Sequence, residues 1–169
     1  MKMSGGVLEQ INRSNGGVPK LPVAGPVMLT ESGVEGDRQR DLRHHGGPFR
    51  AVLMIAAEVI EDLAARGFNV WPGALGENLT VKRLDPANWR GGQQYRIGTD
   101  AIIELTTLRQ PCANLFPYGR SIGEELYDAR CKSGDIASPH WARGGFYARV
   151  LRGGLIAAGA PVELISDVA

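Results

Sequence analysis

The sequence has little of what stabilises small secreted proteins or marks membrane proteins. It contains only two cysteines, Cys112 and Cys131, in 169 residues, which is too few for the disulfide framework of a small extracellular domain. The longest apolar run, residues 51–57, stops at Glu58 and is far shorter than a membrane span. The first ten residues include no apolar segment of the kind found in signal peptides. These absences predict a reducing, cytoplasmic setting and no membrane partner.

A strong charge of either sign is also lacking. The formal net charge is +1, so the overall charge gives no reason to expect a nucleic-acid partner. The cations are 15 arginines and only 4 lysines. Guanidinium groups bind planar oxyanions through paired hydrogen bonds, although a bias in nucleotide composition would give the same ratio. With 43% hydrophobic and 22% charged residues, the chain has a globular composition, and its length predicts a single domain over residues 1–169.

Glycine and proline, by contrast, are abundant, with 23 and 10 residues respectively. Such a composition favours tight turns and short strands over long helices. Apolar and alternating segments predict strands at residues 7–11, 23–29, 49–55, 79–82, 95–98, 102–107, 144–151 and 162–165, and a turn at 153–154. Two helices are predicted, at 58–66 and 122–127. The apolar face of the main helix is expected to consist of Val59, Ile60, Leu63 and Ala64. Roughly seven short strands with one main helix predict a mainly β protein, a barrel or a sandwich.

Cys112 is the residue whose surroundings most favour chemistry. It follows a predicted strand and the backbone-restricting Pro111, and Arg109 precedes it by three residues. A nearby guanidinium lowers a thiol pKa and so favours the thiolate, which attacks electrophiles or binds metals. The alternative is that Cys112 is a small buried apolar side chain, which is the commoner state of free cysteine. Cys131 lies in a weaker context and is expected to be a non-functional thiol.

Residues 38–47 are a predicted loop, and segment 38–50 as a whole combines many cations with glycine. Its cationic and titratable residues are Arg38, Arg40, Arg43, His44, His45 and Arg50, against the single acid Asp41. This composition suits a phosphate or another multiply charged oxyanion. The alternative is a solvated basic loop. The paired histidines could indicate zinc, but zinc needs further ligands, and His140 is remote in sequence.

A third segment, Gly73 to Asn78, places the carboxylate of Glu77 and the amide of Asn78 after two glycines. Either these side chains belong to a site, or they satisfy backbone donors in a tight turn.

Taken in order, these segments resemble the MOSC domain, named after the C-terminal domain of molybdenum cofactor sulfurases. The resemblance covers residues 5–165, and the chain is expected to be a free-standing bacterial-type member, without the fused domains that some relatives carry. The matching pieces are Gly33-Val34-Glu35-Gly36-Asp37-Arg38, His45-Gly46-Gly47, Ala51-Val52, Pro72-Gly73-Ala74-Leu75-Gly76-Glu77-Asn78-Leu79-Thr80, Arg109-Gln110-Pro111-Cys112 and Tyr147-Ala148-Arg149-Val150-Leu151. Each piece alone is weak, whereas the ordered set is specific. Residues 128–143 do not follow the family pattern, which leaves the choice of substrate open.

The resemblance implies a mostly antiparallel β-barrel of the kind seen in the pyruvate kinase barrel domain, with one main helix and short peripheral helices. It also implies that the chain binds the molybdenum cofactor (molybdopterin), with Cys112 as the metal ligand and catalytic residue. The residues expected to hold the cofactor are Lys20, Arg38, Arg43, His45, Arg50, Glu77, Asn78 and Arg109. Related free-standing proteins reduce N-hydroxylated bases and amidoximes with electrons from a separate flavin/iron–sulfur partner. The chain is therefore expected to be a reductase of N-hydroxylated or N-oxygenated small molecules.

Other functions remain open at this stage. In the first alternative, Cys112 carries a persulfide, received from a cysteine desulfurase, as a sulfur carrier for metal–sulfur cluster assembly. A second is a non-catalytic module whose basic segment binds a phosphorylated partner. A cysteine hydrolase would need a histidine base, and the sequence does not indicate which histidine that would be. Pyridoxal phosphate is not predicted, because no lysine has a suitable setting.

Overall fold

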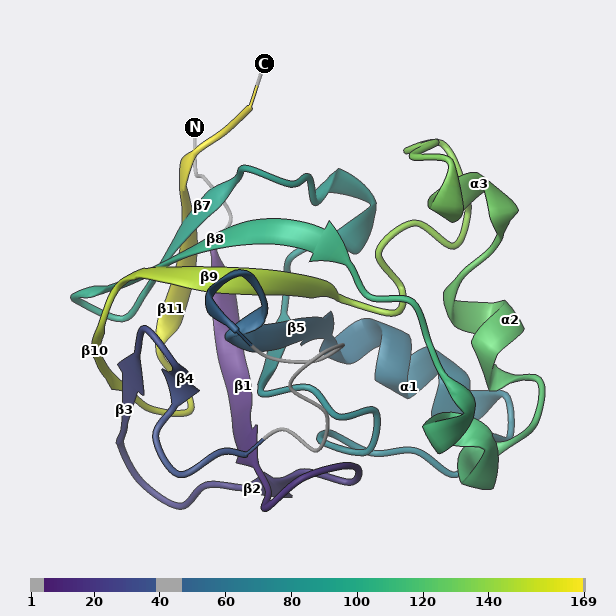
Figure 1. Ribbon diagram of the computed structural model, residues 1–169, viewed down its shortest axis with the longest axis horizontal. Coiled ribbons are helices and arrows are strands. Elements are labelled where there is room, and N and C mark those ends of the chain that lie inside the picture. The colour runs from purple at the N-terminus through teal and green to yellow at the C-terminus, as the bar shows by residue number, and fades with distance from the viewer. Residues whose placement is uncertain (1–4, 39–46, 169) are drawn as a thin grey trace.

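A closed barrel forms the centre of the structure, and its strands arise from the short alternating segments of the sequence. The computed structural model describes residues 5–38 and 47–168. Within this part of the chain seven strands follow one another around the barrel: β11 (Pro161–Ser166), β7 (Gln94–Ile97), β8 (Ala101–Leu108), β9 (Phe146–Arg152), β5 (Val52–Ala56), β6 (Leu79–Lys82) and β1 (Gly6–Arg13). Pairing of β1 with β11 closes the ring (Figure 1). The prediction of a mainly β barrel is confirmed.

Alternation along the strands decides which side chains fill the barrel. In β8, the buried residues Ala101, Ile103 and Leu105 alternate with partly exposed ones, as expected for a strand with one face on the core. In β7, Tyr95 and Ile97 are the buried pair. Every residue of β5 is buried, which explains why its sequence is continuously apolar rather than alternating.

One pairing departs from the expected antiparallel arrangement. β5 pairs with β6 in parallel, with Met54 opposite Leu79 and Ile55 opposite Thr80. The chain between them forms helix α1 (Ala57–Ala65) and a loop, and a parallel pair needs a crossover of this kind. The other strand pairs of the barrel, in the part of the chain described, are antiparallel.

The predictions of the β7–β8 hairpin and of helix α1 are confirmed, whereas those for Phe49 and Ala64 are wrong. Phe49 was predicted to begin a buried strand, but it lies in the 3-10 turn η1 (Pro48–Arg50) and is 62% exposed. Ala64 was predicted on the apolar face of α1 but is exposed, so that face consists of Ala57, Val59, Ile60 and Leu63. A helical pattern fixes a face only to within one position at its edge.

A second, smaller sheet lies beside the barrel. It consists of β10 (Gly154–Ile156), β3 (Val27–Thr30) and β4 (Gly33–Val34). The predicted turn at 153–154 is therefore wrong in part, because Gly154 already pairs with Leu29. The short β2 (Leu21–Pro22) extends the main sheet at β1. These additions arise from long-range pairing, which short sequence patterns do not reveal.

The remaining helical elements follow β8 on one side of the barrel. They are η3 (Ala113–Tyr118), α2 (Ile122–Leu126) and α3 (Ala129–Lys132), while η2 (Pro86–Asn88) lies between β6 and β7. Figure 1 shows α2 beside α1, with α3 further up on the same side of the barrel. Ion pairs of 2.6 Å join Arg66 to Glu125 and Arg143 to Asp62. Among the described residues, no helix is both long enough and apolar enough to cross a membrane.

Candidate functional site

Cys112 lies just beyond β8, immediately before η3, and its side chain is exposed. The segment between β8 and Cys112 is held in place because the Arg109 N–H donates to the Gly145 carbonyl oxygen over 2.9 Å. The thiol therefore faces solvent at the end of a barrel strand. The alternative that Cys112 is a buried structural residue is wrong. That description fits Cys131, which is 3% exposed and lies 3.5 Å from the Ser138 hydroxyl oxygen.

Arg109 places a buried positive charge close to this thiol. The residue is only 5% exposed. Its Nη2 donates to the Leu75 carbonyl oxygen over 2.7 Å, and its Nη1 donates to the Gly144 carbonyl oxygen over 3.3 Å. Burial lowers the pKa of Arg109, whereas negative charge on Tyr147, Cys112 or Glu77 raises it. These groups thus form one electrostatic cluster, in which the guanidinium also joins the 73–78 loop to the turn before β9.

Tyr147 and Arg50 belong to the same cluster. Burial raises the pKa of Tyr147, while the positive charges of Arg109 and Arg50 lower it and the Cys112 charge raises it. The Arg50 guanidinium carbon lies 5.0 Å from the centroid of the Tyr147 ring, within cation–π range. Thr106 fixes η1 because its hydroxyl group lies 2.6 Å from the Phe49 carbonyl oxygen. The end of segment 38–50 is thereby brought to the Cys112 side of the barrel.

Glu77 is the most unusual charged group of the cluster. It is fully buried, and its Oε2 accepts a hydrogen bond of 3.1 Å from the Thr80 hydroxyl. Its Oε1 has no hydrogen-bond partner in the described part of the chain. Burial raises the pKa of Glu77 to about 7, against the lowering effects of the Gly73 and Glu77 N–H groups, of Thr80 and of the Arg109 charge. Sequence reasoning chose Glu77 as a candidate but did not reveal this environment.

Lys20 and Asn78 meet at Asp37. The Lys20 Nζ atom lies 2.6 Å from Asp37 Oδ1, and Asn78 Nδ2 donates to Asp37 Oδ2 over 2.9 Å. Asn78 Oδ1 also accepts the Leu53 N–H, so its amide is engaged on both sides. Asp37 was not among the predicted site residues, although it stands in the quoted Gly33–Arg38 motif. The network anchors the chain directly before Arg38, where the basic segment begins.

The remaining predicted site residues are Arg38, Arg43 and His45. Arg38 is exposed, and its N–H donates to the Ser14 carbonyl oxygen over 2.8 Å. Arg43 and His45 lie outside the described residues. Residues 5–38 and 47–168 contain no group of three or more His, Cys, Asp or Glu side chains able to hold a metal ion. The ligand roles predicted for all these residues stay predictions.

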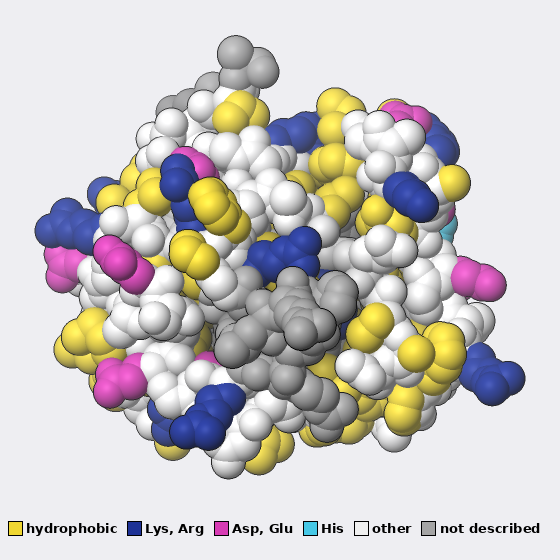
Figure 2. All heavy atoms as spheres, viewed as in Figure 1, with side chains coloured by type: hydrophobic (Ala, Val, Ile, Leu, Met, Phe, Trp, Pro, Cys, Tyr) yellow, Lys and Arg dark blue, Asp and Glu magenta, His cyan; other side chains and the backbone are white. Residues whose placement is uncertain are grey.

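Aromatic side chains lie on η3 and on the loop after α1. Trp71 meets Tyr118 edge to face, with ring centroids 5.6 Å apart. Burial raises the pKa of Tyr118, and the charge of Glu77 raises it further. Phe116, also on η3, is 49% exposed. Figure 2 shows hydrophobic side chains gathered over the η3 region of this face. The segment that follows Cys112 thus carries an apolar surface.

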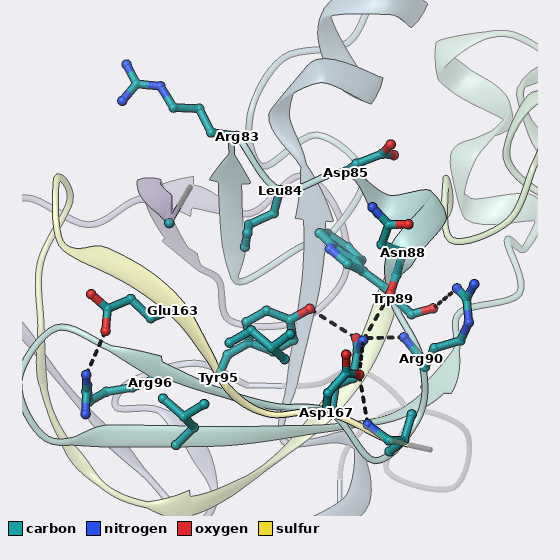
Figure 3. A pocket seen from close by; sticks show the side chains of 15 residues that line it. Arg83, Leu84, Asp85, Asn88, Trp89, Arg90, Tyr95, Arg96, Glu163 and Asp167 are labelled. Atoms are coloured by element: carbon teal, nitrogen blue, oxygen red, sulfur yellow. Dashed lines mark hydrogen bonds and ion pairs between the residues drawn. The ribbon is translucent and has the colours of Figure 1, made fainter. Parts of the chain in front are cut away.

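A separate cavity of about 1080 Å³ lies between the β6–β7 connection, β7 and β11 (Figure 3). None of the predicted site residues lines it. Several of its charged groups are already engaged, since Arg96 pairs with Glu163 over 2.6 Å and Asp167 accepts a hydrogen bond from Gln93. The cavity therefore does not compete with the Cys112 cluster as the candidate site.

Comparisons with known proteins identify the family and the fold. The family described as MOSC domain matches residues 41–163. The uncharacterized protein YflK of Bacillus subtilis (strain 168) is 35% identical over 153 residues, covering 89% of this chain and 63% of YflK. A protein named reductase from Gibberella moniliformis (strain M3125 / FGSC 7600) is 29% identical over 150 residues, covering 83% of this chain and 24% of that protein.

A solved structure shares the fold. The crystal structure of YiiM from Geobacillus stearothermophilus matches with a TM-score of 0.69 and 27% identity, covering 95% of this chain and 75% of that one. The chain spans less than two thirds of the length of the curated relatives it matches.

Proposed function

Because the chain belongs to the MOSC domain family, we propose that it binds the molybdenum cofactor through Cys112 and reduces an N-hydroxylated or N-oxygenated small molecule. The observation that carries this proposal is the exposed Cys112 thiol beside the buried charge of Arg109. The thiol can be reached from solvent, and a buried cation lies behind it.

The residues present fit the implied group. Thiolate is a soft ligand suited to a metal such as molybdenum. The cofactor carries a phosphate and is anionic, and the cluster offers positive charge from Arg109 and Arg50. When bound, the cofactor would supply the two-electron chemistry, while the protein supplies binding and polarity.

The chain's own residues would position the reaction. Cys112 would hold the metal just beyond the end of β8, and Arg109 keeps the 73–78 loop against the turn before β9. Lys20 and Asn78 act through Asp37 to hold the start of the basic segment. The apolar surface of Phe116 suits a planar organic substrate.

The reaction needs a supply of electrons. Cleavage of an N–O bond consumes two electrons and two protons and yields the N–H compound and water. We assign the electrons to a separate flavin/iron–sulfur protein. The relative named reductase supports this class of reaction.

Metal content tests the proposal. Protein purified from a host that makes the cofactor should contain molybdenum, Cys112→Ser should lose nearly all of it, and Cys131→Ser should retain it because that thiol is buried. Absence of molybdenum from the parent protein, or equal content in the Cys112 variant, would count against the assignment.

A sulfur carrier is the second candidate, favoured by the same exposure of Cys112, which a protein donor could reach. After incubation with a cysteine desulfurase and cysteine, mass spectrometry should find one added sulfur on Cys112 and none on Cys131. An unmodified Cys112 would remove this candidate.

A further inference from the structure

We propose that Phe116 is the specificity-determining residue of this site: its exposed ring stacks on an aromatic ring of the substrate, so that aromatic N-oxygenated compounds bind more tightly than aliphatic ones. For its bearing on catalysis the inference rests on the proposed function. Its first test measures binding alone, so the two proposals can fail separately.

The side chains of η3 lie in an inner and an outer row. The turn begins at Cys112, whose carbonyl oxygen accepts the Leu115 N–H over 3.1 Å. Residues three apart share a row in a 3-10 helix. Leu115, which is fully buried, and Tyr118, which is half-buried, form the inner row, whereas Ala113 and Phe116 are exposed. Phe116 thus belongs to the outer row, which starts at the residue directly after the thiol.

The inner side of η3 is anchored without Phe116. The Tyr118 ring meets Trp71 edge to face. At the end of the turn Gly119 packs so closely on Phe68 that an added Cβ would lie 2.8 Å from the Phe68 ring. The Gly119 N–H also donates to the Phe116 carbonyl oxygen over 3.0 Å. The backbone that carries the Phe116 ring is therefore fixed, and a pre-organised group loses less freedom when a ligand binds to it.

The ring of Phe116 is left for a ligand. Phe116 is 49% exposed and does not belong to the hydrophobic core. In the described part of the chain, none of the ring–ring or cation–π contacts involves it. Phe49, which is 62% exposed, differs because the Arg149 guanidinium carbon lies 5.6 Å from its ring centroid. Exposure alone therefore does not distinguish the two phenylalanines, whereas the lack of a partner does.

The surroundings of Phe116 favour ring contact over ion pairing. Residues 110–119 include no charged side chain. In a 3-10 turn the rise is about 2 Å per residue, so four residues place Phe116 about 8 Å along the chain from Cys112. A ring joined directly to an N–O group held at Cys112 can reach it. Stacking on an aromatic side chain favours a planar ring, and an aliphatic substrate gains no such contact.

A pair of amidoximes isolates the contribution of the ring. Benzamidoxime and acetamidoxime share the N–O group, and only the first has an aromatic ring. Titration of the full chain, followed by NMR, should show contacts between the benzamidoxime protons and the Phe116 ring. Phe116→Ala should raise the dissociation constant of benzamidoxime about five- to tenfold and leave that of acetamidoxime unchanged. No binding of benzamidoxime by wild type, or equal dissociation constants in Phe116→Ala, would overturn the proposal.

Two further variants separate stacking from a general loss of structure. Phe116→Tyr keeps an aromatic ring and should retain the wild-type dissociation constant for benzamidoxime. Phe49→Ala removes the other exposed phenylalanine and should also leave it unchanged, because that ring lies under Arg149. A loss of binding in Phe116→Tyr equal to that in Phe116→Ala, or in Phe49→Ala, would show that ring stacking on Phe116 is not the cause.

Turnover by protein that contains molybdenum tests the bearing on catalysis. Phe116→Ala should raise KM for benzamidoxime by the same factor as the dissociation constant and leave kcat within about twofold, as expected for a contact made equally in the ground and transition states. Both constants for acetamidoxime should stay unchanged. If wild type reduces neither amidoxime, the proposed function fails, while the binding titration still decides the role of Phe116.

Discussion

Lys20 and Asp37 form a buried ion pair, with Nζ and Oδ1 2.6 Å apart and side chains only 8% and 4% exposed. Asp37 is fully engaged, because Oδ1 also accepts the Ser14 N–H and Oδ2 accepts Asn78 Nδ2. The pair joins the turn after β1 to the residue before Arg38. The pair therefore holds the chain in place where segment 38–50 begins. The Lys20 ammonium group is not a free cation exposed to solvent.

Breaking this pair should destabilise the protein strongly. Lys20→Met leaves the Asp37 charge buried without its cation, which we expect to cost about 3–5 kcal/mol of unfolding free energy. The matched control is Arg96→Met at the exposed Arg96–Glu163 pair, which should cost no more than about 1 kcal/mol. Urea unfolding followed by circular dichroism measures both. Similar losses in the two variants would mean that the Lys20 pair is not buried in solution.

Gly73 should tolerate no side chain. Its φ is +98°, and a Cβ there would lie 2.3 Å from the Lys20 carbonyl oxygen. Gly67 has the same φ of +98° but open space around the missing Cβ. Gly67→Ala should therefore cost only the strain of the left-handed backbone, about 1–2 kcal/mol, and Gly73→Ala distinctly more. Thermal unfolding of both variants compares the cost of backbone strain alone, in Gly67→Ala, with the cost of strain plus steric clash, in Gly73→Ala. Gly73→Ala at least as stable as Gly67→Ala would refute the close approach.

Stability should depend on pH through Glu77. Its pKa is about 7 in the folded protein against 4.5 ordinarily, so the folded state holds this proton more tightly than the unfolded chain. The contribution is fully present below about pH 4.5 and is lost as the pH rises through about 7, amounting to on the order of 3 kcal/mol. Denaturant unfolding of wild type and Glu77→Gln across this range isolates it. The difference between the two proteins should change with pH, and a constant difference would exclude the raised pKa.

Arg109 should not be replaceable by lysine. A single ammonium group cannot reproduce the fork that reaches both Leu75 and Gly144. Leaving one buried carbonyl unpaired should cost about 1–3 kcal/mol, whereas Arg152→Lys, at a side chain that is 65% exposed, should change stability by no more than about 0.5 kcal/mol. Chemical denaturation of both variants is the measurement. Equal stabilities would show that the fork is dispensable.

Much of the fold followed from local patterns. The apolar residues of the β7–β8 hairpin and of helix α1 recur with a clear period, because one face of each element is buried and the other is exposed to solvent. The ordered motifs identified the family, and the exposed Cys112 after a strand end agrees with the expected location. Phe49 shows the limit of such patterns: an apolar residue beside a buried strand need not belong to it.

The sequence by itself determined the residue types, the glycine-rich turns, the barrel class and the presence of a cysteine three residues after an arginine. Only the tertiary structure decided that Arg109 donates to two backbone carbonyls, that Lys20 pairs with Asp37, and that Glu77 keeps an oxygen without a partner. The physical reason is that burial and hydrogen-bond partners come from segments far apart in the chain. The charge state of a side chain depends on those partners, and no local pattern encodes them.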